Sequence, residues 1–182
     1  VSSDLHESTV DTADPLVGAF VDRVVGAGGR VVVAGSERLT THTDEAIAAA
    51  ATDAVAADVD RLVERHRNQP SKAARLASEA SGLPFETVTR AWGDGPIDEV
   101  VRYGDQVEID TGLAVLDAPS RFEEAATGLA AAGAQLVVHV TDDGIPAGHP
   151  IAPVLKVSGD ADTVAALPDD IDVDATATDV DE

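Results

Sequence analysis

The sequence of 182 residues contains no cysteine and no methionine, and only two lysines, Lys72 and Lys156. Without cysteine the chain can form no disulfide framework, no thiolate nucleophile and no thiolate metal site. Basic residues number 12 against 34 acidic ones, so no basic patch is available to bind nucleic acid or an anionic membrane. The sequence also lacks an apolar run long enough to span a bilayer and a signal-peptide pattern. We therefore expect a cytoplasmic protein with no nucleic-acid or membrane partner.

The acidic excess gives a formal net charge of -22, although 44% of the residues are apolar. Disordered acidic chains lack such apolar content, so the charge must lie on the surface of a folded body. Aspartate outnumbers glutamate by 23 to 11, and aromatic residues make up 3% of the chain. Concentrated salt screens the repulsion between so many carboxylates. We interpret the chain as halophilic, adapted to a salt-rich cytoplasm; a merely acidic protein is the alternative.

Short apolar runs alternate with segments of helical periodicity along most of the chain. The pattern predicts strands at 30–34, 112–116, 136–140 and 153–157, and either a strand or a short helix at 97–101. It predicts helices at 14–26, with Asp14 as N-cap, and at 45–66, 72–80, 85–91, 123–132 and 163–167. Strands separated by helices indicate an α/β fold, with a doubly wound, mainly parallel sheet and flanking helices in a single domain. We expect this domain to cover 14–174, between a flexible acidic N-terminus (1–13) and an acidic tail (175–182).

Common catalytic motifs are absent from the chain: it has no G-x-S-x-G, H-E-x-x-H, P-loop or G-x-G-x-x-G pattern. Ligands of doubly wound sheets bind beyond the carboxyl ends of the strands. Glu37, Asp117 and the segment from Thr141 to Gly144 each lie just past an expected strand end. We expect Glu37, Asp117 and Thr141 to meet Lys156 in a common crevice. Each acid also has an ordinary alternative, because Glu37 suits a surface position and Asp117 suits a turn before Ala-Pro.

Several short motifs resemble, in order and spacing, those of the altronate/galactarate (sugar-acid) dehydratases, in the C-terminal catalytic region of that family. The first motifs are Ser36-Glu37 with Glu45, similar to S-E-T-P-E-x-x-G-A-E, and Asn68-x-Pro70-Ser71, similar to N-x-P-S-P-G-N. The segment GLAVLDAPS at 112–120 is similar to G-L-x-x-M-D-T-P-G, and Ala126-Thr127-Gly128 is similar to A-T-G. Residues 140–144 are similar to T-T-G-R-G. The segment 153–157 is similar to P-x-x-K-x, with Lys156 as the lysine, and the segment 169–174 is similar to D-D-I-D-I-N.

The resemblance implies a hydro-lyase, or the catalytic-region subunit of one, that removes water from a sugar acid such as altronate or galactarate to give a 2-keto-3-deoxy acid. Carried over to this sequence, it implies catalytic residues Glu37, Asp117 and Lys156, and substrate-binding residues Thr127, Gly128, Thr141 and Gly144. The implied metal ligands are Glu45, Asp170 and Asp172, which would hold a divalent cation such as Fe²⁺, Mn²⁺ or Mg²⁺. Such a cation neutralises charge that develops when the proton beside a carboxylate leaves. We expect two kinds of partner, a small anionic sugar acid and a separate chain with the N-terminal dehydratase part, in a homo- or hetero-oligomer.

Differences within the motifs support a second hypothesis. The arginine of T-T-G-R-G and the P-G-N loop are missing, and Ser120 replaces a glycine. A non-catalytic homologue, acting as a structural or small-ligand-binding subunit, is therefore the alternative. Glu45 suits the first turn of a helix, and the acids of 169–174 suit a solvated turn. His139 is expected to be packed within a strand.

Overall fold

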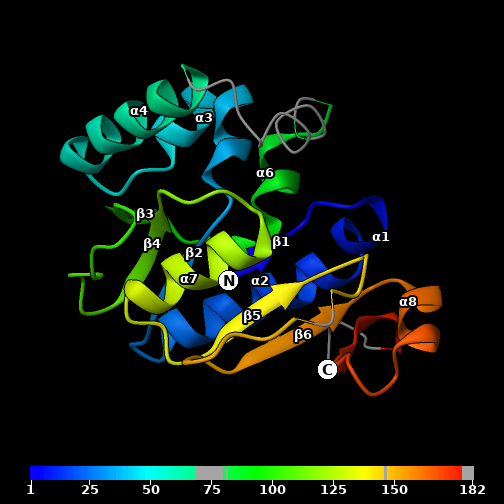
Figure 1. Cartoon of the computed structure of the whole chain (residues 1–182). Coiled ribbons are helices and arrows are strands. Elements are labelled where there is room, and N and C mark those ends of the chain that lie inside the picture. The colour runs from blue at the N-terminus through cyan, green and yellow to red at the C-terminus, as the bar shows by residue number, and fades with distance from the viewer. Residues whose placement is uncertain (69–79, 81, 146, 178–182) are drawn as a thin grey trace.

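The computed structural model describes residues 1–68, 80, 82–145 and 147–177, and all strand pairings within them are parallel (Figure 1). One sheet has the order β2-β4-β3 and the other the order β1-β5-β6-β7. Their strands are β1 (Ser2–Ser3), β2 (Arg30–Val33), β3 (Ile97–Val101), β4 (Gly112–Leu116), β5 (Val137–Val140), β6 (Val154–Ser158) and β7 (Val173–Asp174). The α/β class with parallel strands and flanking helices is thus confirmed.

The main chain of Val1 joins the two sheets. Its nitrogen donates to the Val32 carbonyl at 2.5 Å, and its carbonyl accepts from the Ala34 nitrogen at 2.9 Å. These two bonds have the pattern of a parallel ladder. Read across both sheets, the strand order is therefore β3-β4-β2-β1-β5-β6-β7, so the expected single sheet appears as two halves that meet at β1.

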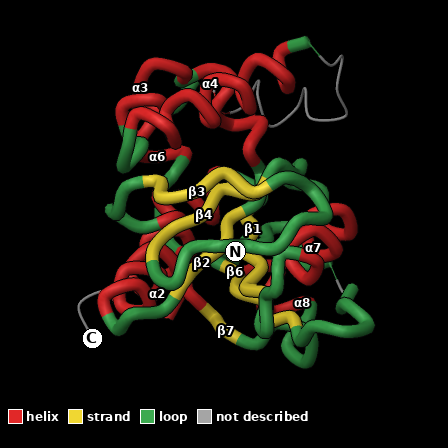
Figure 2. The backbone as a smooth tube through the Cα atoms, turned by 90° about the vertical axis from the view of Figure 1, so that its left-hand side faces the viewer, coloured by secondary structure: helices red, strands yellow, loops and turns green. Residues whose placement is uncertain are grey.

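Helices cover both faces of the strands. The described α-helices are α1 (Glu7–Val10), α2 (Ala13–Gly26), α3 (Thr43–Ala48), α4 (Asp53–Arg67), α6 (Phe85–Val88), α7 (Phe122–Ala131) and α8 (Ala161–Ala166), and the 3₁₀ turns are η1 (Ser36–Thr41), η2 (Arg90–Trp92) and η3 (Ala175–Ala177). Figure 2 shows α2 and α7 on opposite sides of the strands, with α3, α4 and α6 gathered beyond one end. Within the described residues, we find no helix with the length and apolarity needed to cross a membrane.

The core has two layers because side chains alternate across each strand. All of β4 is buried; Leu113 and Val115 belong to the cluster that contains α2, and Ala114 and Leu116 to the cluster that contains α7. The glycine Gly18 lets α2 approach η2, since a Cβ at that position would lie 2.1 Å from the Arg90 carbonyl oxygen. A continuous apolar run such as GLAVL is the pattern expected of a strand that is covered on both faces.

The expectation that 1–13 is flexible was wrong. Ser2 and Ser3 form β1 at the centre of the strand order and are both buried, and 7–10 form α1. Asp14 is not the N-cap of α2, which begins at Ala13; it is fully buried, and its Oδ1 accepts from the Ser3 hydroxyl at 2.8 Å. The polar composition of this segment concealed a strand that is stabilised by its neighbours rather than by its own propensity.

The expected helix over 45–66 is two helices, α3 and α4, with a break at 49–52. The nitrogen of Ala51 donates to the Ile97 carbonyl at 2.8 Å, and the nitrogen of Ile97 donates to the Ala49 carbonyl at 2.9 Å. The edge of β3 therefore takes the backbone groups that would have continued the helix, and Thr52 caps α4. Residues 97–101 form a strand, and the helix expected at 72–80 lies outside the described residues except for residue 80.

Arg38 ties three distant segments together inside the molecule. Its guanidinium is completely buried and donates to the carbonyls of Gly35 at 3.0 Å, Val88 at 2.9 Å and Ser3 at 2.8 Å. It also lies 5.3 Å from the ring centroid of Trp92. Burial lowers the pKa of Arg38, an effect opposed by the nearby carboxylates of Asp14, Glu37 and Asp4.

Candidate functional site

The loops that follow β2 and β4 lie against each other at the carboxyl edge of the sheet. Gly35 has a φ of 91°, which glycine adopts readily, and it turns the chain from β2 into η1. The nitrogens of Gly35 and Ser36 both donate to the Ala118 carbonyl, at 3.0 and 3.2 Å. This pairing brings Glu37 and Asp117 to the same edge, as expected for neighbouring parallel strands.

A histidine that the sequence did not point to connects these loops. His66, near the end of α4, places its Nε2 3.0 Å from the Ser36 hydroxyl oxygen and 2.8 Å from Oδ1 of Asp117. A carboxylate only accepts hydrogen bonds, so Nε2 carries the hydrogen and donates to Asp117. Both contacts use the same ring nitrogen, so Ser36, His66 and Asp117 do not form a hydrolase triad, which uses both nitrogens.

The charge of the cluster is partly balanced by Arg65, whose Nη1 pairs with the second oxygen of Asp117. The side chain of Arg65 is 44% exposed, whereas those of His66 and Asp117 are 12% and 11% exposed. Burial lowers the pKa of His66, with an opposing effect from Glu37 and a reinforcing one from Arg65. The imidazole is therefore mainly neutral at pH 7 with its hydrogen on Nε2, so Nδ1 carries a lone pair that can accept a hydrogen bond or a proton.

Glu37 contributes a buried carboxylate to the same edge. It is 2% exposed, and its Oε1 accepts from the nitrogen of Ser120 at 2.6 Å. Among the described residues, its Oε2 has no hydrogen-bond partner. A buried acceptor without a partner costs about 1–3 kcal/mol, and such a cost is often tolerated where a ligand supplies the missing bond. Oε2 is therefore a buried acceptor whose hydrogen-bonding capacity is not used by the described residues.

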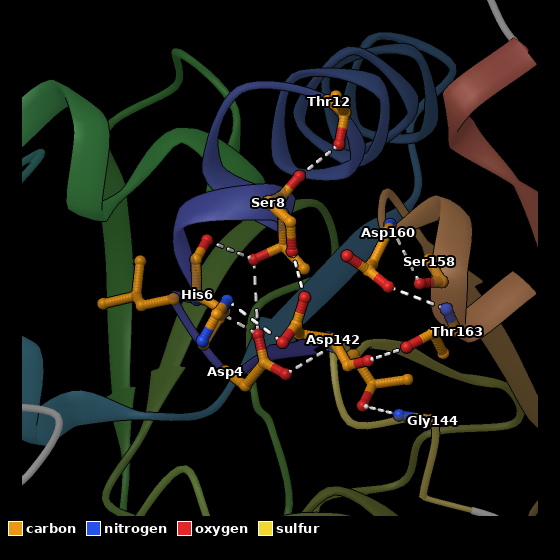
Figure 3. A network of polar contacts seen from close by, with 12 residues as sticks. Asp4, His6, Ser8, Thr12, Asp142, Gly144, Ser158, Asp160 and Thr163 are labelled. Carbon is orange, nitrogen blue, oxygen red and sulfur yellow. Dashed lines mark hydrogen bonds and ion pairs between the residues drawn. The ribbon is translucent and has the colours of Figure 1, made fainter.

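Thr141 and Gly144 belong to a second polar network at the carboxyl ends of β1, β5 and β6 (Figure 3). Its centre is Asp142, whose carboxylate accepts from the Ser8 hydroxyl and lies 3.0 Å from Nδ1 of His6. The nitrogen of Asp142 donates to Asp4 at 2.7 Å. The hydroxyl of Thr141 accepts from the nitrogen of Gly144 at 3.1 Å and so closes the turn after β5. These contacts hold the loop after β5 against the loop after β1.

Lys156 lies within β6, not at its end. It is 7% exposed, and its Nζ is 4.0 Å from Oδ1 of Asp170. It stands in register with His139 of β5, whose ring centroid is 4.7 Å from that of Phe122. Burial, aided by nearby positive charge that includes Lys156, lowers the pKa of His139 to about 4, so this histidine is neutral and packed as expected.

Thr127 and Gly128 make contacts within the fold. The Thr127 hydroxyl donates to the Glu123 carbonyl, one turn earlier in α7, at 2.7 Å. A Cβ at Gly128 would lie 2.8 Å from the Tyr103 ring and 2.9 Å from Leu116. Gly128 therefore permits close packing of α7 on the sheet, and substrate binding by these two residues stays a prediction.

The three predicted metal ligands are not brought together. Glu45 is exposed in α3, whereas Asp170 and Asp172 lie beside β6 and β7 at the other end of the molecule (Figures 1 and 2). Asp172 instead pairs with the main chain of Lys156, through bonds of 2.8 and 3.0 Å. Over 1–68, 82–145 and 147–177, no three histidine, aspartate or glutamate side chains are placed to hold a metal. These three residues therefore cannot bind one cation together. The short motifs could not reveal how far apart the residues lie in the structure.

Arg65 and His66 were missed because basic residues in the last turn of a helix are common, since they offset the helix dipole. Their proximity to Asn68, which begins one of the family-like motifs, was the available signal. The rest of that motif, at Pro70 and Ser71, lies outside the described residues.

Comparisons with known proteins agree with the motifs. The family described as "D-galactarate/Altronate dehydratase, C-terminal" matches residues 88–180. The altronate dehydratase of Bacillus subtilis (strain 168) is 28% identical over 176 residues, which cover 90% of this chain and 35% of that protein. The altronate dehydratase of Escherichia coli (strain K12) is 26% identical over 176 residues, with the same coverage of 90% and 35%. The chain thus spans about a third of the length of these curated relatives.

Proposed function

The chain belongs to the D-galactarate/altronate dehydratase family, and on that premise we propose that it is a catalytic-region subunit of a sugar-acid hydro-lyase. A separate chain would supply the part of the enzyme that lies outside the matched third of the longer relatives. The substrate would be a small sugar acid such as altronate or galactarate. One observation carries the proposal: Glu37, His66 and Asp117 converge at the carboxyl edge of the parallel sheet, on residues of the family-like motifs or beside them.

The proposed reaction is an elimination of water. His66 Nδ1 takes the proton from the carbon next to the substrate carboxylate, and the electron pair of that C–H bond forms a C=C bond to the next carbon. Hydroxide leaves that carbon and takes the proton from the imidazolium, which returns His66 to its neutral form. The resulting enol rearranges to the 2-keto-3-deoxy acid. Asp117 stabilises the imidazolium through Nε2, at 2.8 Å.

The remaining groups would bind and orient the substrate. Arg65 is the partly exposed cation of the cluster, so we assign it to the substrate carboxylate, for which its planar guanidinium is suited. Oε2 of Glu37 would accept from a substrate hydroxyl. The described residues offer no fit for a divalent cation, so we place the ligands of any Fe²⁺, Mn²⁺ or Mg²⁺ in the separate chain.

The test is an assay for 2-keto acid formation in high salt. The chain is combined with the product of the reading frame that encodes the N-terminal dehydratase part, with each divalent metal in turn, and with altronate or galactarate. We expect turnover from the pair and none from either chain alone. His66→Gln should lower kcat by about 100-fold or more, whereas the control His42→Gln, outside the cluster, should change it by less than about threefold.

Two outcomes would contradict the proposal at different points. No turnover in any combination, with both proteins folded, would reject the enzyme and favour the alternative of a non-catalytic structural or ligand-binding subunit. Turnover that His66→Gln does not affect would keep the enzyme but remove His66 as the base.

A further inference from the structure

An apolar groove runs beside α2, on the face of the sheet opposite α7. Its walls are Leu16, Val17 and Phe20 of α2 and apolar side chains of β5, β6 and β7, and its volume is about 260 Å³. A second hollow of about 320 Å³, toward the starts of β2 and β5, shares Phe20, Leu136 and Val138 with it. The two hollows are therefore adjacent, and Figure 1 shows α2 passing behind β5 there.

On this face of the sheet, burial is less complete beyond β5. In β5, next to α2, Val138 and Val140 are 7% and 0% exposed. In the strands beyond it, Leu155 of β6 and Val173 of β7 are only partly buried, although both pack against the same core cluster. This face of the sheet thus stays apolar past the point where α2 covers it.

Two large side chains at the groove are exposed to solvent. Phe20 is 47% exposed and Leu136 is 46% exposed. The groove of about 260 Å³ is lined entirely by apolar residues, in a protein whose net charge is -22. Exposed apolar surface costs about 25 cal/mol per Å², and a contiguous patch of it usually marks an interaction site.

We propose that this groove binds an amphipathic helix of the separate chain that supplies the rest of the dehydratase. The inference rests on the proposed function. The curated relatives are about three times as long as the part that this chain matches, since it covers 35% of each. A partner of that size would need a contact surface on this domain, and a helix with an apolar stripe is the element that an apolar groove recognises.

Other occupants fit the groove less well. A second copy would bring another net charge of -22 to the same interface, which is repulsive before salt screens it. The end of this chain, 178–182, has the sequence TDVDE, and three acids in five residues do not suit an apolar surface.

The experiment measures affinity of the purified chain for the product of the reading frame that encodes the N-terminal dehydratase part, in high salt. Phe20→Asn and Leu136→Asn should each weaken binding by about tenfold or more, as expected for a central apolar contact. Ile151→Asn is the matched control, because Ile151 is apolar and 82% exposed but lies outside the groove; its affinity should stay within about twofold. Thermal unfolding of each variant confirms that it is folded.

Equal affinity of the three variants and the wild type would overturn the groove as the docking site, while turnover by the pair would leave the proposed function intact. Normal docking without turnover would keep the groove as the docking site and reject the proposed function. Self-association of the chain alone, abolished by Leu136→Asn but not by Ile151→Asn, would assign the groove to a second copy and likewise overturn the proposal.

Discussion

Replacing Asp14 by asparagine should stabilise this protein at neutral pH and change its stability little in acid. Asp14 is 0% exposed, and its Oδ1 accepts from the Ser3 hydroxyl at 2.8 Å. Its Oδ2 has no hydrogen-bond partner among the described residues. Burial raises the pKa of Asp14 from 3.8 to about 6, against the opposing effects of the Ser3 hydroxyl and of Arg38.

The direction of this pH dependence follows from which state, folded or unfolded, binds the Asp14 proton more tightly. The folded protein holds the Asp14 proton more tightly than the unfolded chain, so the stability due to protonation is fully present below pH 3.8 and is lost as the pH rises through about 6. A shift of about 2 pKa units corresponds to about 3 kcal/mol. Asparagine cannot ionise, so Asp14→Asn should raise the free energy of unfolding by about 3 kcal/mol at about pH 7.5 and by about half as much near pH 5.

Urea unfolding at constant high salt, repeated between about pH 4 and 7.5, measures this difference directly. Asp11→Asn is the control, because Asp11 is exposed at the end of α1; it should change stability by less than about 0.5 kcal/mol at every pH. A lower stability of Asp14→Asn at neutral pH, or an offset that does not vary with pH, would refute the reasoning. The first result would mean that the attraction between Asp14 and Arg38 outweighs the cost of burying the carboxylate, and the second that the two effects cancel and leave the pKa of Asp14 unshifted.

Three further predictions concern packing and binding. Gly128→Ala should destabilise the domain by about 1–3 kcal/mol in urea unfolding, because its Cβ would meet Tyr103 and Leu116, whereas Gly26→Ala meets nothing within 4 Å and should be nearly neutral. Arg38→Lys should lower the free energy of unfolding by about 3 kcal/mol or more, since one ammonium cannot reach the three carbonyls that the guanidinium binds. Arg61→Lys, on the surface, should lower it little, and equal effects would contradict the role of Arg38. Arg65→Ala should raise the KM of the assembled enzyme for the sugar acid by about tenfold, because Arg65 is the group assigned to the substrate carboxylate, and Arg61→Ala on the same helix should not; the same KM for both variants would count against Arg65 as a binding residue.

The strands that could be predicted from sequence are those whose own residues favour a buried strand. The runs VVV at 31–33 of β2 and GLAVL of β4 are apolar throughout because helices cover both of their faces. The strand of Ser2 and Ser3 has no such pattern; it forms because the main chain of Val1 pairs with β2 and that of Ser2 and Ser3 pairs with β5. The break before Thr52 likewise depends on a contact with β3, which is distant in sequence.

Only those residues of the candidate site that directly follow strand ends could be predicted from the sequence. Glu37 and Asp117 follow β2 and β4, and parallel pairing places both at one edge. His66 comes from a helix end that packs there for reasons of tertiary structure. The expected metal ligands failed because a motif fixes residue type and order, whereas coordination requires a shared position in space; Glu45 and Asp170 have the first without the second.

The bonds of Arg38 have a consequence for how the protein responds to dilution of salt. They run to neutral carbonyl groups in the dry interior, where dissolved ions do not reach, and they link the first strand, the loop that carries Glu37 and the turn before Trp92. Removing salt strengthens repulsion among the surface carboxylates but leaves these internal links unweakened. The loop bearing Glu37 should consequently stay native until the whole domain gives way, so that loss of the site and loss of secondary structure coincide in one cooperative step.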